Sequence, residues 1–400
     1  MQKSTPIKVE FIALMALLMS IVAFSIDALL PALPAIGFDL GETDLAKHQQ
    51  LITMIFLGLG FGQLLFGPLS DSYGRKPMVY IGFTVFVTGS VLCVTTKSFE
   101  LMILGRILQG IGLSSPRTIA IAMIRDLYSG DYMAKLLSIV VMFFILIPII
   151  APSLGQFILT YSGWRGIFNF NLIFGTLVIL WFGFRQPETL IIEKRIPFKL
   201  STFISGTKTF FKFKKAVAFT LVSGFITGSF MVYLSTSQHI FQVQYQLGDM
   251  FPYVFGSTAF AVGFATFSNS QLVMRFGSYN IAFYAAIAYF LVSLLYVILF
   301  YSGENPHLYV ILTFFLLQFF AVGFLFGNLR SLAMEPLGHI AGIGAALNGF
   351  ISTVLAVPIA GFIGSFVTTS ALPLFIGFTC FGLLSVITFL IVKRINLQEN

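Results

Sequence analysis

Long apolar runs alternate with short polar segments along the whole chain of 400 residues. A helix needs about 20 apolar residues to cross the hydrocarbon core of a bilayer. Twelve runs reach that length, near residues 10–31, 49–70, 77–96, 101–125, 133–159, 163–184, 215–240, 250–273, 279–301, 307–331, 340–368 and 371–392. Lipid cannot satisfy free backbone groups, and the sequence lacks the ~10-residue alternating segments of barrel strands. The runs therefore predict transmembrane helices.

Composition narrows the class of protein further. Apolar residues make up 57 % of the chain, charged residues 10 %, and the mean hydropathy is +0.94. Soluble domains carry about 25 % charged residues, so a soluble enzyme, a disordered chain and a nucleic-acid-binding protein are excluded. We expect a polytopic membrane protein with lipid around it and no nucleic-acid partner.

The basic residues predict the orientation. If the N-terminus is inside, 18 of the 23 Lys and Arg lie in inner segments, and only Lys47, Lys97 and Arg165 lie in outer loops. Cytoplasmic loops are enriched in Lys and Arg. The first apolar run is longer than the core of a cleavable signal peptide, so we expect it to be retained. The prediction is a multi-pass protein of the inner (plasma) membrane with both termini in the cytoplasm.

Two short motifs recur at nearly one offset and suggest an internal duplication. Residues 73–76 (YGRK) are echoed by residues 276–279 (FGSY), and Pro152-x-x-Gly155 recurs as Pro358-x-x-Gly361. Transporters are often built from such repeats. We expect an all-α membrane fold of twelve helices in two pseudo-symmetric six-helix bundles around a central cavity. The bundles are expected at residues 1–190 and 215–400, joined by a basic cytoplasmic linker at 191–214 that anionic lipid attracts.

Several kinds of chemistry have no motif in this sequence. It contains no G-x-x-x-x-G-K-[ST] phosphate loop and no TVGYG-like channel filter. Both cysteines, Cys93 and Cys380, fall in apolar runs and support neither a disulfide framework nor a metal site. The remaining expectation is a secondary transporter, not an enzyme, that uses an ion gradient and no cofactor.

The segment Gly67-Pro68-Leu69-Ser70-Asp71-Ser72-Tyr73-Gly74-Arg75-Lys76-Pro77 closely resembles the G-x-L-x-D-x-x-G-R-[KR] signature of the major facilitator superfamily. Residues 105–110 (GRILQG) with 124–126 (IRD), and 151–155 (APSLG), resemble the fourth- and fifth-span motifs of its twelve-span drug:proton antiporters. Residues 25–34 (SIDALLPALP) and 335–342 (EPLGHIAG) are similar to the bicyclomycin and chloramphenicol/florfenicol resistance subgroup. The resemblance covers essentially the whole chain.

The resemblance implies a conformational latch formed by Gly67, Asp71, Gly74 and Arg75, which stabilises the outward-open state. Gly67 would leave room for two helices to close, Gly74 would allow the turn, and Asp71 would pair with a cation or a helix N-terminus. The alternative is an ordinary helix–loop–helix with cytoplasmic basic residues.

The fifth-span motif, with Pro148, Pro152 and Gly155, would kink and thin its helix. The resemblance associates this motif with exchange rather than uptake. Gln156 replaces a common second glycine, which is a departure from the pattern.

Asp27 is the only acidic residue well inside a predicted span. Carboxylates within the membrane are costly and mark ion or proton paths by default. Asp27 and Arg106 both lie roughly 6–8 Å below the outer boundary at 1.5 Å per residue, so an ion pair between them is possible. We predict that both residues couple protons to transport. The alternatives are an interfacial Asp27 that caps a helix break near Pro31, and a purely structural Arg106.

Arg117 suggests the type of substrate. It follows Arg106 by eleven residues, which places both on one face of a helix about 16 Å apart. A second cation within the span suggests an anionic or carboxylate-bearing substrate. The alternative is that Arg117 binds backbone carbonyls or extends toward the cytoplasm. Asp27, Arg117 and Tyr233 are the candidate substrate-binding residues.

These features predict a proton-coupled antiporter that exports a small amphipathic compound, such as an antibiotic, by alternating access. Its partners would be a small-molecule substrate, protons and membrane lipid, and we expect a monomer. Two alternatives remain at this point. One is a transporter of an endogenous metabolite such as a carboxylate siderophore, and the other is a non-transporting membrane sensor or scaffold.

Overall fold

The computed structural model describes residues 9–128 and 130–399, and all regular structure in those ranges is helical. This confirms the all-α class. The predicted cytoplasmic residues 1–8 lie outside the described part of the chain. The chain divides into two compact units, Met1–Leu200 and Ser201–Asn400. The division falls inside the linker expected at residues 191–214.

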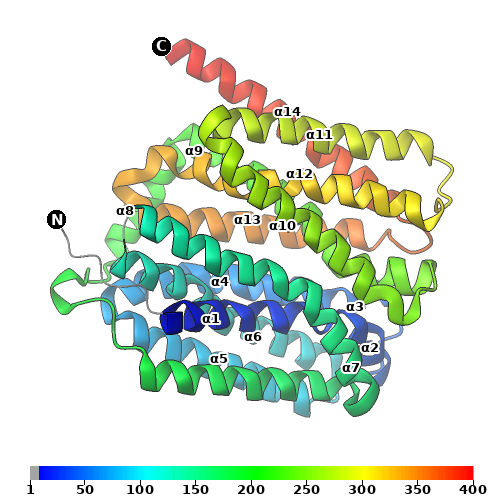
Figure 1. Ribbon diagram of the computed structural model, residues 1–400, viewed down its shortest axis with the longest axis horizontal. Coiled ribbons are helices and arrows are strands. Elements are labelled where there is room, and N and C mark those ends of the chain that lie inside the picture. The colour runs from blue at the N-terminus through cyan, green and yellow to red at the C-terminus, as the bar shows by residue number, and fades with distance from the viewer. Residues whose placement is uncertain (1–8, 129, 400) are drawn as a thin grey trace. The chain divides into compact units, whose positions relative to one another are not determined.

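The helices of the first unit run side by side along its length (Figure 1). The α-helix of the first span is interrupted near Pro31 and Pro34, because proline has no N–H to donate to a carbonyl of the preceding turn. The elements are α1 (Val9–Asp27), η1 (Leu30–Ala32), α2 (Leu33–Asp39), α3 (Leu45–His48), α4 (Gln50–Tyr73), α5 (Arg75–Thr95), α6 (Phe99–Leu127), α7 (Gly130–Arg185) and η2 (Ile192–Lys194).

Helix α7 contains both the fifth and the sixth predicted spans. Its backbone leaves the helical region at Gly163, where φ is 65° and ψ is 178°, a conformation that favours glycine. Among the described residues, eleven helices are long and apolar enough to cross a membrane, and one of them, Ile147–Arg185, runs through this break. The turn at Gly163 therefore accounts for the difference from the twelve predicted spans.

Helix α6 packs against its neighbours through glycines. A Cβ on Gly58 of α4 would lie 2.1 Å from the Ile107 carbonyl oxygen, and one on Gly110 would lie 2.0 Å from that of Ile55. A Cβ on Gly112 would lie 2.3 Å from the backbone nitrogen of Phe86 in α5. Small residues allow such close approach between membrane helices. This packing holds α6, which carries Arg106 and Arg117, at the centre of the first unit.

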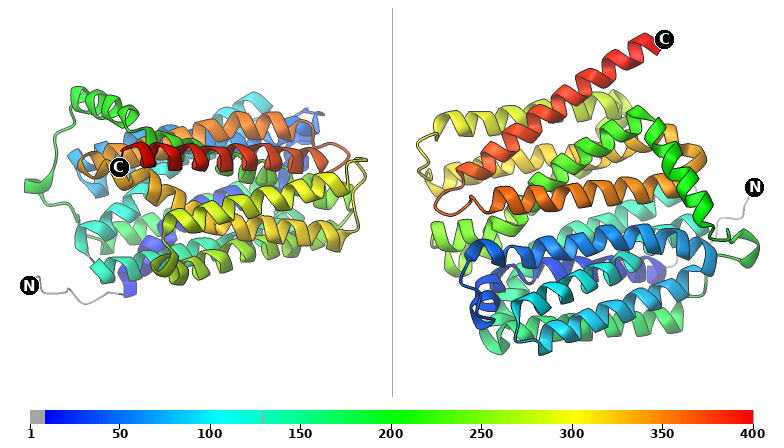
Figure 2. Two further views of the ribbon diagram at one scale, coloured as in Figure 1. Left: turned by 90° about the horizontal axis from the view of Figure 1, so that it is seen from above. Right: turned by 180° about the vertical axis from the view of Figure 1, so that it is seen from behind.

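The second unit also consists of long helices joined by short connections (Figure 2). Its core holds a dense group of aromatic rings around Tyr233 and Phe315. Its elements are α8 (Leu200–Lys212), α9 (Lys214–Gln238), the π-helix η3 (His239–Gln244), η4 (Gly248–Met250), α10 (Phe251–Phe276), α11 (Ser278–Leu299), α12 (Leu308–Met334), η5 (Glu335–Ile340), α13 (Ala341–Gly364) and α14 (Leu372–Glu399).

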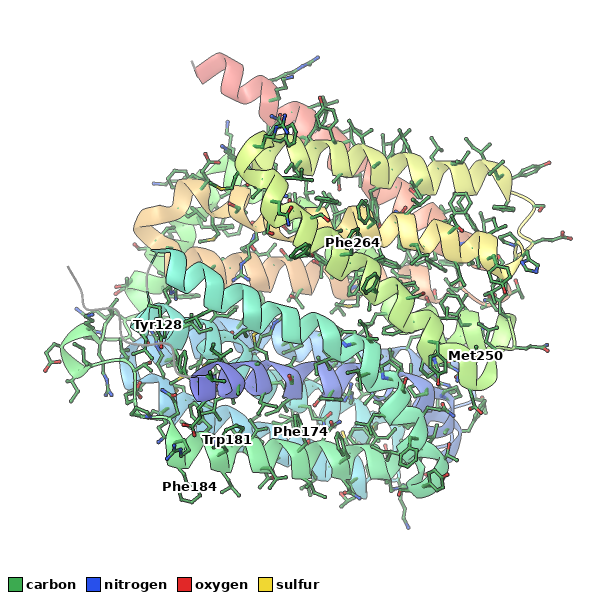
Figure 3. All side chains as sticks on the ribbon, in the orientation of Figure 1. Tyr128, Phe174, Trp181, Phe184, Met250 and Phe264 are labelled. Carbon is green, nitrogen blue, oxygen red and sulfur yellow. The ribbon has the colours of Figure 1, made fainter. Side chains whose placement is uncertain are left out.

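Many large apolar side chains lie on the outside of both units. Phe184 of α7 and Phe264 of α10 are examples, and both are exposed (Figure 3). In water such surfaces would favour aggregation. On helices of this length they are suited to contact with lipid, in agreement with the predicted membrane class.

Candidate functional site

Asp27 is the last residue of α1 and is 5 % exposed. The helix ends there because Pro31 offers no N–H to the Asp27 carbonyl oxygen. None of the hydrogen bonds or ion pairs among the described residues involves the Asp27 carboxylate. An acidic side chain is thus buried in an apolar span, next to a break in the helix.

Arg106 of α6 is fully buried and is held mainly by backbone oxygens. Its Nε donates to the Leu51 carbonyl at 2.8 Å, and its Nη1 donates to the Ser25 carbonyl at 3.1 Å. Nη1 also donates to Oε1 of Gln109 at 2.8 Å, and Gln109 Nε2 donates to Ser90 Oγ at 2.8 Å. Arg106 therefore connects α6 to α1 and α4, and through Gln109 to α5.

The predicted ion pair between Asp27 and Arg106 is not formed in this structure. The carbonyl oxygens of Ser25 and Leu51 accept from the guanidinium instead. Arg106 nevertheless reaches α1 two residues before Asp27. Its Nη2 is buried without a hydrogen-bond partner in the described part of the chain, as is Oδ1 of Asn171 in α7. In this structure Arg106 has the contacts of the structural alternative, since it binds backbone carbonyls of two other helices. Its part in proton coupling stays a prediction.

The fifth-span motif packs directly against the helix break beside Asp27. A Cβ on Gly155 of α7 would lie 1.9 Å from the carbonyl oxygen of Ala28, the residue after Asp27. Pro148 and Pro152 lie inside the same helix, about two turns and one turn before Gly155, respectively. The motif therefore brings the α7 backbone into contact with α1 at the position of the buried carboxyl group.

A second set of contacts holds the end of α2. Asp39 Oδ2 accepts from Arg165 Nη1 at 2.8 Å and from Trp164 Nε1 at 3.1 Å. Arg165 also donates to the carbonyl oxygens of Val94 and Thr96 at the end of α5. Trp164 and Arg165 directly follow the turn at Gly163. Their hydrogen bonds therefore connect the end of the first span to α5 and α7.

The other two candidate substrate residues have different surroundings. Arg117 is half-buried on α6. Tyr233 of α9, in the second unit, is 1 % exposed, and its hydroxyl shares a hydrogen bond of 2.7 Å with Thr258 Oγ1. Its ring packs against Phe315 and Phe319. In this conformation Tyr233 belongs to the aromatic core of its unit, and its substrate role stays a prediction.

The candidate latch residues form a charged cluster around Arg75. The Arg75 side chain is 5 % exposed and binds Asp126 of α6 through two hydrogen bonds, from Nε at 2.9 Å and from Nη2 at 3.1 Å. Its Nη1 donates to Ser70 Oγ at 2.8 Å and to Asp71. Gly74 has a φ of 103°, which explains why the turn requires glycine. The cluster ties together the ends of α4, α5 and α6.

Gly67 lies inside α4, and a Cβ at this position would meet no described atom within 4 Å. The close helix contact expected at Gly67 and the latch role of the motif stay predictions.

Glu188, which follows α7, caps the N-terminus of α5. Its Oε1 and Oε2 accept from the backbone N–H groups of Arg75 and Lys76, both at 3.0 Å. Carboxylates stabilise helix N-termini because free N–H groups and the helix dipole favour negative charge there. The chain after Glu188 is held at the same place, because the backbone N–H of Ile196 donates to the Asp71 carbonyl at the end of α4 at 3.0 Å. Sequence reasoning missed Glu188, since a lone Glu in a basic stretch carries no signal of its distant partner.

The sequence model of the Major Facilitator Superfamily matches residues 15–357. The chain is 29 % identical to an uncharacterized MFS-type transporter, YdgK, of Bacillus subtilis, over 86 % of both chains. It is 27 % identical to a bicyclomycin resistance protein homolog of Haemophilus influenzae, over 100 % of this chain and 99 % of that one. It is 33 % identical to the multidrug resistance protein MdtL of Klebsiella pneumoniae, over 41 % of this chain and 42 % of that one.

Solved transporters share the fold. The human organic anion transporter MFSD10 (TETRAN) has a TM-score of 0.69 and 18 % identity, over 96 % of this chain and 99 % of that one. A D-xylose–proton symporter has a TM-score of 0.72 and 15 % identity, over 95 % of this chain and 97 % of that one.

The match to the family's sequence model covers most of the chain, including the Gly67–Pro77 motif. One of these relatives is named an MFS-type transporter, and the other two are named for drug resistance. Together with the long apolar helices, this shows a multi-pass membrane transporter rather than an enzyme. The chain therefore belongs to the Major Facilitator Superfamily.

Proposed function

We propose that the protein is a proton-coupled antiporter that exports small amphipathic compounds across the inner membrane. The observation that carries this proposal is the position of Asp27. It is a buried carboxyl group without a partner among the described residues, at the end of α1, between Ser25, which Arg106 binds, and Ala28, which Gly155 approaches. Ionisable groups inside a membrane are maintained for function because their charge is costly there.

The contacts suggest how a proton could move helices. A neutral Asp27 suits its apolar surroundings, and Arg106 then bonds the carbonyls of Ser25 and Leu51. When Asp27 releases its proton, the new charge attracts the guanidinium of Arg106, whose Nη2 has no partner in the described structure. Moving Arg106 toward Asp27 would loosen its bonds to α1 and α4. Protonation would thereby change the packing of the helices that carry Asp27, Arg106 and Gly155.

Transport in everted membrane vesicles tests the proposal. In vesicles acidified inside, addition of an exported compound should release protons, which a pH-sensitive dye reports. Chloramphenicol and ethidium are suitable probes because relatives are named for drug resistance. We expect Asp27→Asn to abolish this signal and Asp27→Glu to retain part of it, while the exposed loop change Glu304→Gln leaves it intact. Full proton-coupled transport by Asp27→Asn, with normal amounts of protein in the membrane, would exclude the role of Asp27.

The preference for an anionic or carboxylate-bearing substrate rests on the sequence position of Arg117. We expect Arg117→Ala to weaken binding of polycarboxylates more than binding of neutral compounds, with Arg117→Lys intermediate. A thermal-shift screen that includes chloramphenicol-type drugs and polycarboxylates measures this. Equal losses for both classes would count against an anionic substrate. A polycarboxylate as the best ligand would favour the metabolite alternative over drug export.

A further inference from the structure

Helix α8 is not one of the candidate membrane spans, yet its position in the chain ties it to one. A single residue, Phe213, separates Lys212 at its end from Lys214 at the start of α9. Phe213 leaves the helical region, with ψ at 88°, so α8 does not continue the axis of α9 (Figure 2). Since α9 begins the candidate span Lys214–Gln244, α8 lies at the boundary of the membrane.

One face of α8 packs on the second unit. Phe210 is fully buried, and a Cβ on Gly206 would lie 2.5 Å from the Ile343 side chain of α13. At about 100° per residue, Gly206 and Phe210 point within about 40° of each other. This contact fixes the rotation of α8 about its own axis, so it also determines which side chains face outward.

The outward surface of α8 divides into an apolar strip and a basic strip. Leu200, Ile204 and Phe211 are 62 %, 46 % and 55 % exposed, and their directions fall within an arc of about 40° beside the buried face. Lys208 and Lys212, one turn apart, are exposed on the side of this strip away from the buried face. Three large apolar side chains and a pair of lysines thus lie next to each other on one exposed surface.

We propose that α8 is an interfacial helix that binds anionic phospholipids. Leu200, Ile204 and Phe211 enter the boundary between headgroups and acyl chains, and Lys208 and Lys212 bind the headgroup phosphates. The inference goes beyond the transport function and does not depend on it. The sequence predicts only that the basic linker is attracted to anionic lipid. The proposal adds which residues of the linker face the lipid.

A lipid surface fits these residues for two physical reasons. Exposed apolar residues beside lysines are the pattern of helices that lie in the membrane interface. Long lysine side chains can extend from an apolar environment to the phosphates while their methylene groups stay in contact with lipid. The cytoplasmic leaflet carries anionic lipid, which attracts basic segments next to a span. The positive charge of α8 is complementary to that surface.

Fluorescence quenching in proteoliposomes tests the binding surface. Cys380 is exposed and is replaced by Ala, whereas Cys93 is buried and can stay. An environment-sensitive dye is attached at Ile204→Cys on the apolar strip, or at Ser205→Cys, an exposed position on the polar side of the same helix. The vesicles contain phosphatidylglycerol and phosphatidylcholine, with bromine on the acyl chains of one or the other lipid.

We expect brominated phosphatidylglycerol to quench the dye at position 204 about threefold more strongly than the dye at position 205, because only the first enters the interface. At position 204, brominated phosphatidylglycerol should also quench more strongly than brominated phosphatidylcholine. The double change Lys208→Gln with Lys212→Gln should remove this lipid preference. The matched change Lys393→Gln with Arg394→Gln, at two exposed cations of α14, should retain it.

Three outcomes would overturn the proposal. Equal quenching at positions 204 and 205 would show that the apolar strip does not enter lipid. Equal quenching by the two lipids in the otherwise unmodified protein would remove the anionic preference. Protection of position 204 from both brominated lipid and aqueous iodide would show that protein covers the strip.

Discussion

The contact between Gly155 and Ala28 makes a prediction that can be worked out from the structure. Gly155→Ala would place a Cβ 1.9 Å from the Ala28 carbonyl oxygen, whereas ordinary contacts begin at 3.4 Å. The α7 backbone and the α1 break must therefore move apart by about 1.5 Å, which removes close packing around the junction. Inserting a methyl group into a packed interior usually costs about 1–3 kcal/mol.

The chain supplies its own control for this change. Gly361 occupies the same place in Pro358-x-x-Gly361 as Gly155 does in Pro152-x-x-Gly155, but a Cβ on Gly361 would meet no described atom within 4 Å. Both glycines lie inside helices, so Ala gains about 0.5–1 kcal/mol of helix stability at each. This gain cancels when the two variants are compared. Their difference therefore isolates the clash with Ala28.

Thermal unfolding of the purified variants in one detergent measures that difference. We expect Gly155→Ala to melt roughly 4–8 °C below Gly361→Ala. This range follows if the clash with Ala28 costs about 2 kcal/mol and each kcal/mol lowers the melting temperature by about 2–4 °C, as is typical of domains of 150–250 residues. In vesicles, Gly155→Ala should also impair proton-coupled export more than Gly361→Ala does, because the displaced segment adjoins Asp27. Equal melting temperatures for the two variants would refute the packing argument.

Three further predictions concern the ends of the first-unit helices. Asp126→Asn should lower the stability of the first unit by about 2 kcal/mol, because it removes the charge that binds the buried Arg75 side chain; denaturant unfolding measures this, and an unchanged midpoint would contradict it. Glu188→Gln should speed hydrogen exchange at the start of α5 by about tenfold, as expected for losing about 1.4 kcal/mol of helix capping; unchanged exchange there, with Glu193→Gln at an exposed position of η2 as a control, would exclude a capping role. The backbone N–H of Asp44, together with Lys47, lowers the pKa of Glu42 in the turn before α4. Because the folded-state pKa lies below the unfolded value, this stabilisation is present at neutral pH and is lost as the pH falls through the lowered value. Glu42→Gln should therefore reduce the hydrogen-exchange protection of residues 41–48 more at pH 7 than in acid, where Glu42 of the folded protein is protonated, and an equal effect at neutral and acid pH would disprove the charge contribution.

Much of the fold follows from local sequence patterns. A run of about 20 apolar residues must become a helix in a bilayer because its backbone groups have no other partners there. The predicted runs accordingly match the observed helices, apart from the ends and the short turn at Gly163. The motif at Gly67–Pro77 also identified the family before any contact was known. These inferences succeed because they depend on neighbours in the chain.

The candidate site could be predicted only in part. Burial of Asp27 and Arg106 follows from their place within spans, and Arg106 does reach α1 close to Asp27. Its actual acceptors are the backbone carbonyls of Ser25 and Leu51. Every residue has a carbonyl, so no side-chain pattern reveals which one an arginine will find. The sequence-based prediction therefore paired Arg106 with Asp27, the one acidic side chain at the same depth in the membrane.

By itself, the sequence determined that this chain is a helical membrane protein of a transporter family, with three charged residues, Asp27, Arg106 and Arg117, well inside its predicted spans. The tertiary structure decided what those residues and motifs contact. It placed Gly155 against Ala28, Asp126 on Arg75 and Glu188 on the start of α5. It also determined which face of α8 is left for lipid. Apolar runs are local features of the chain, whereas these contacts join residues up to 137 positions apart that only packing brings together.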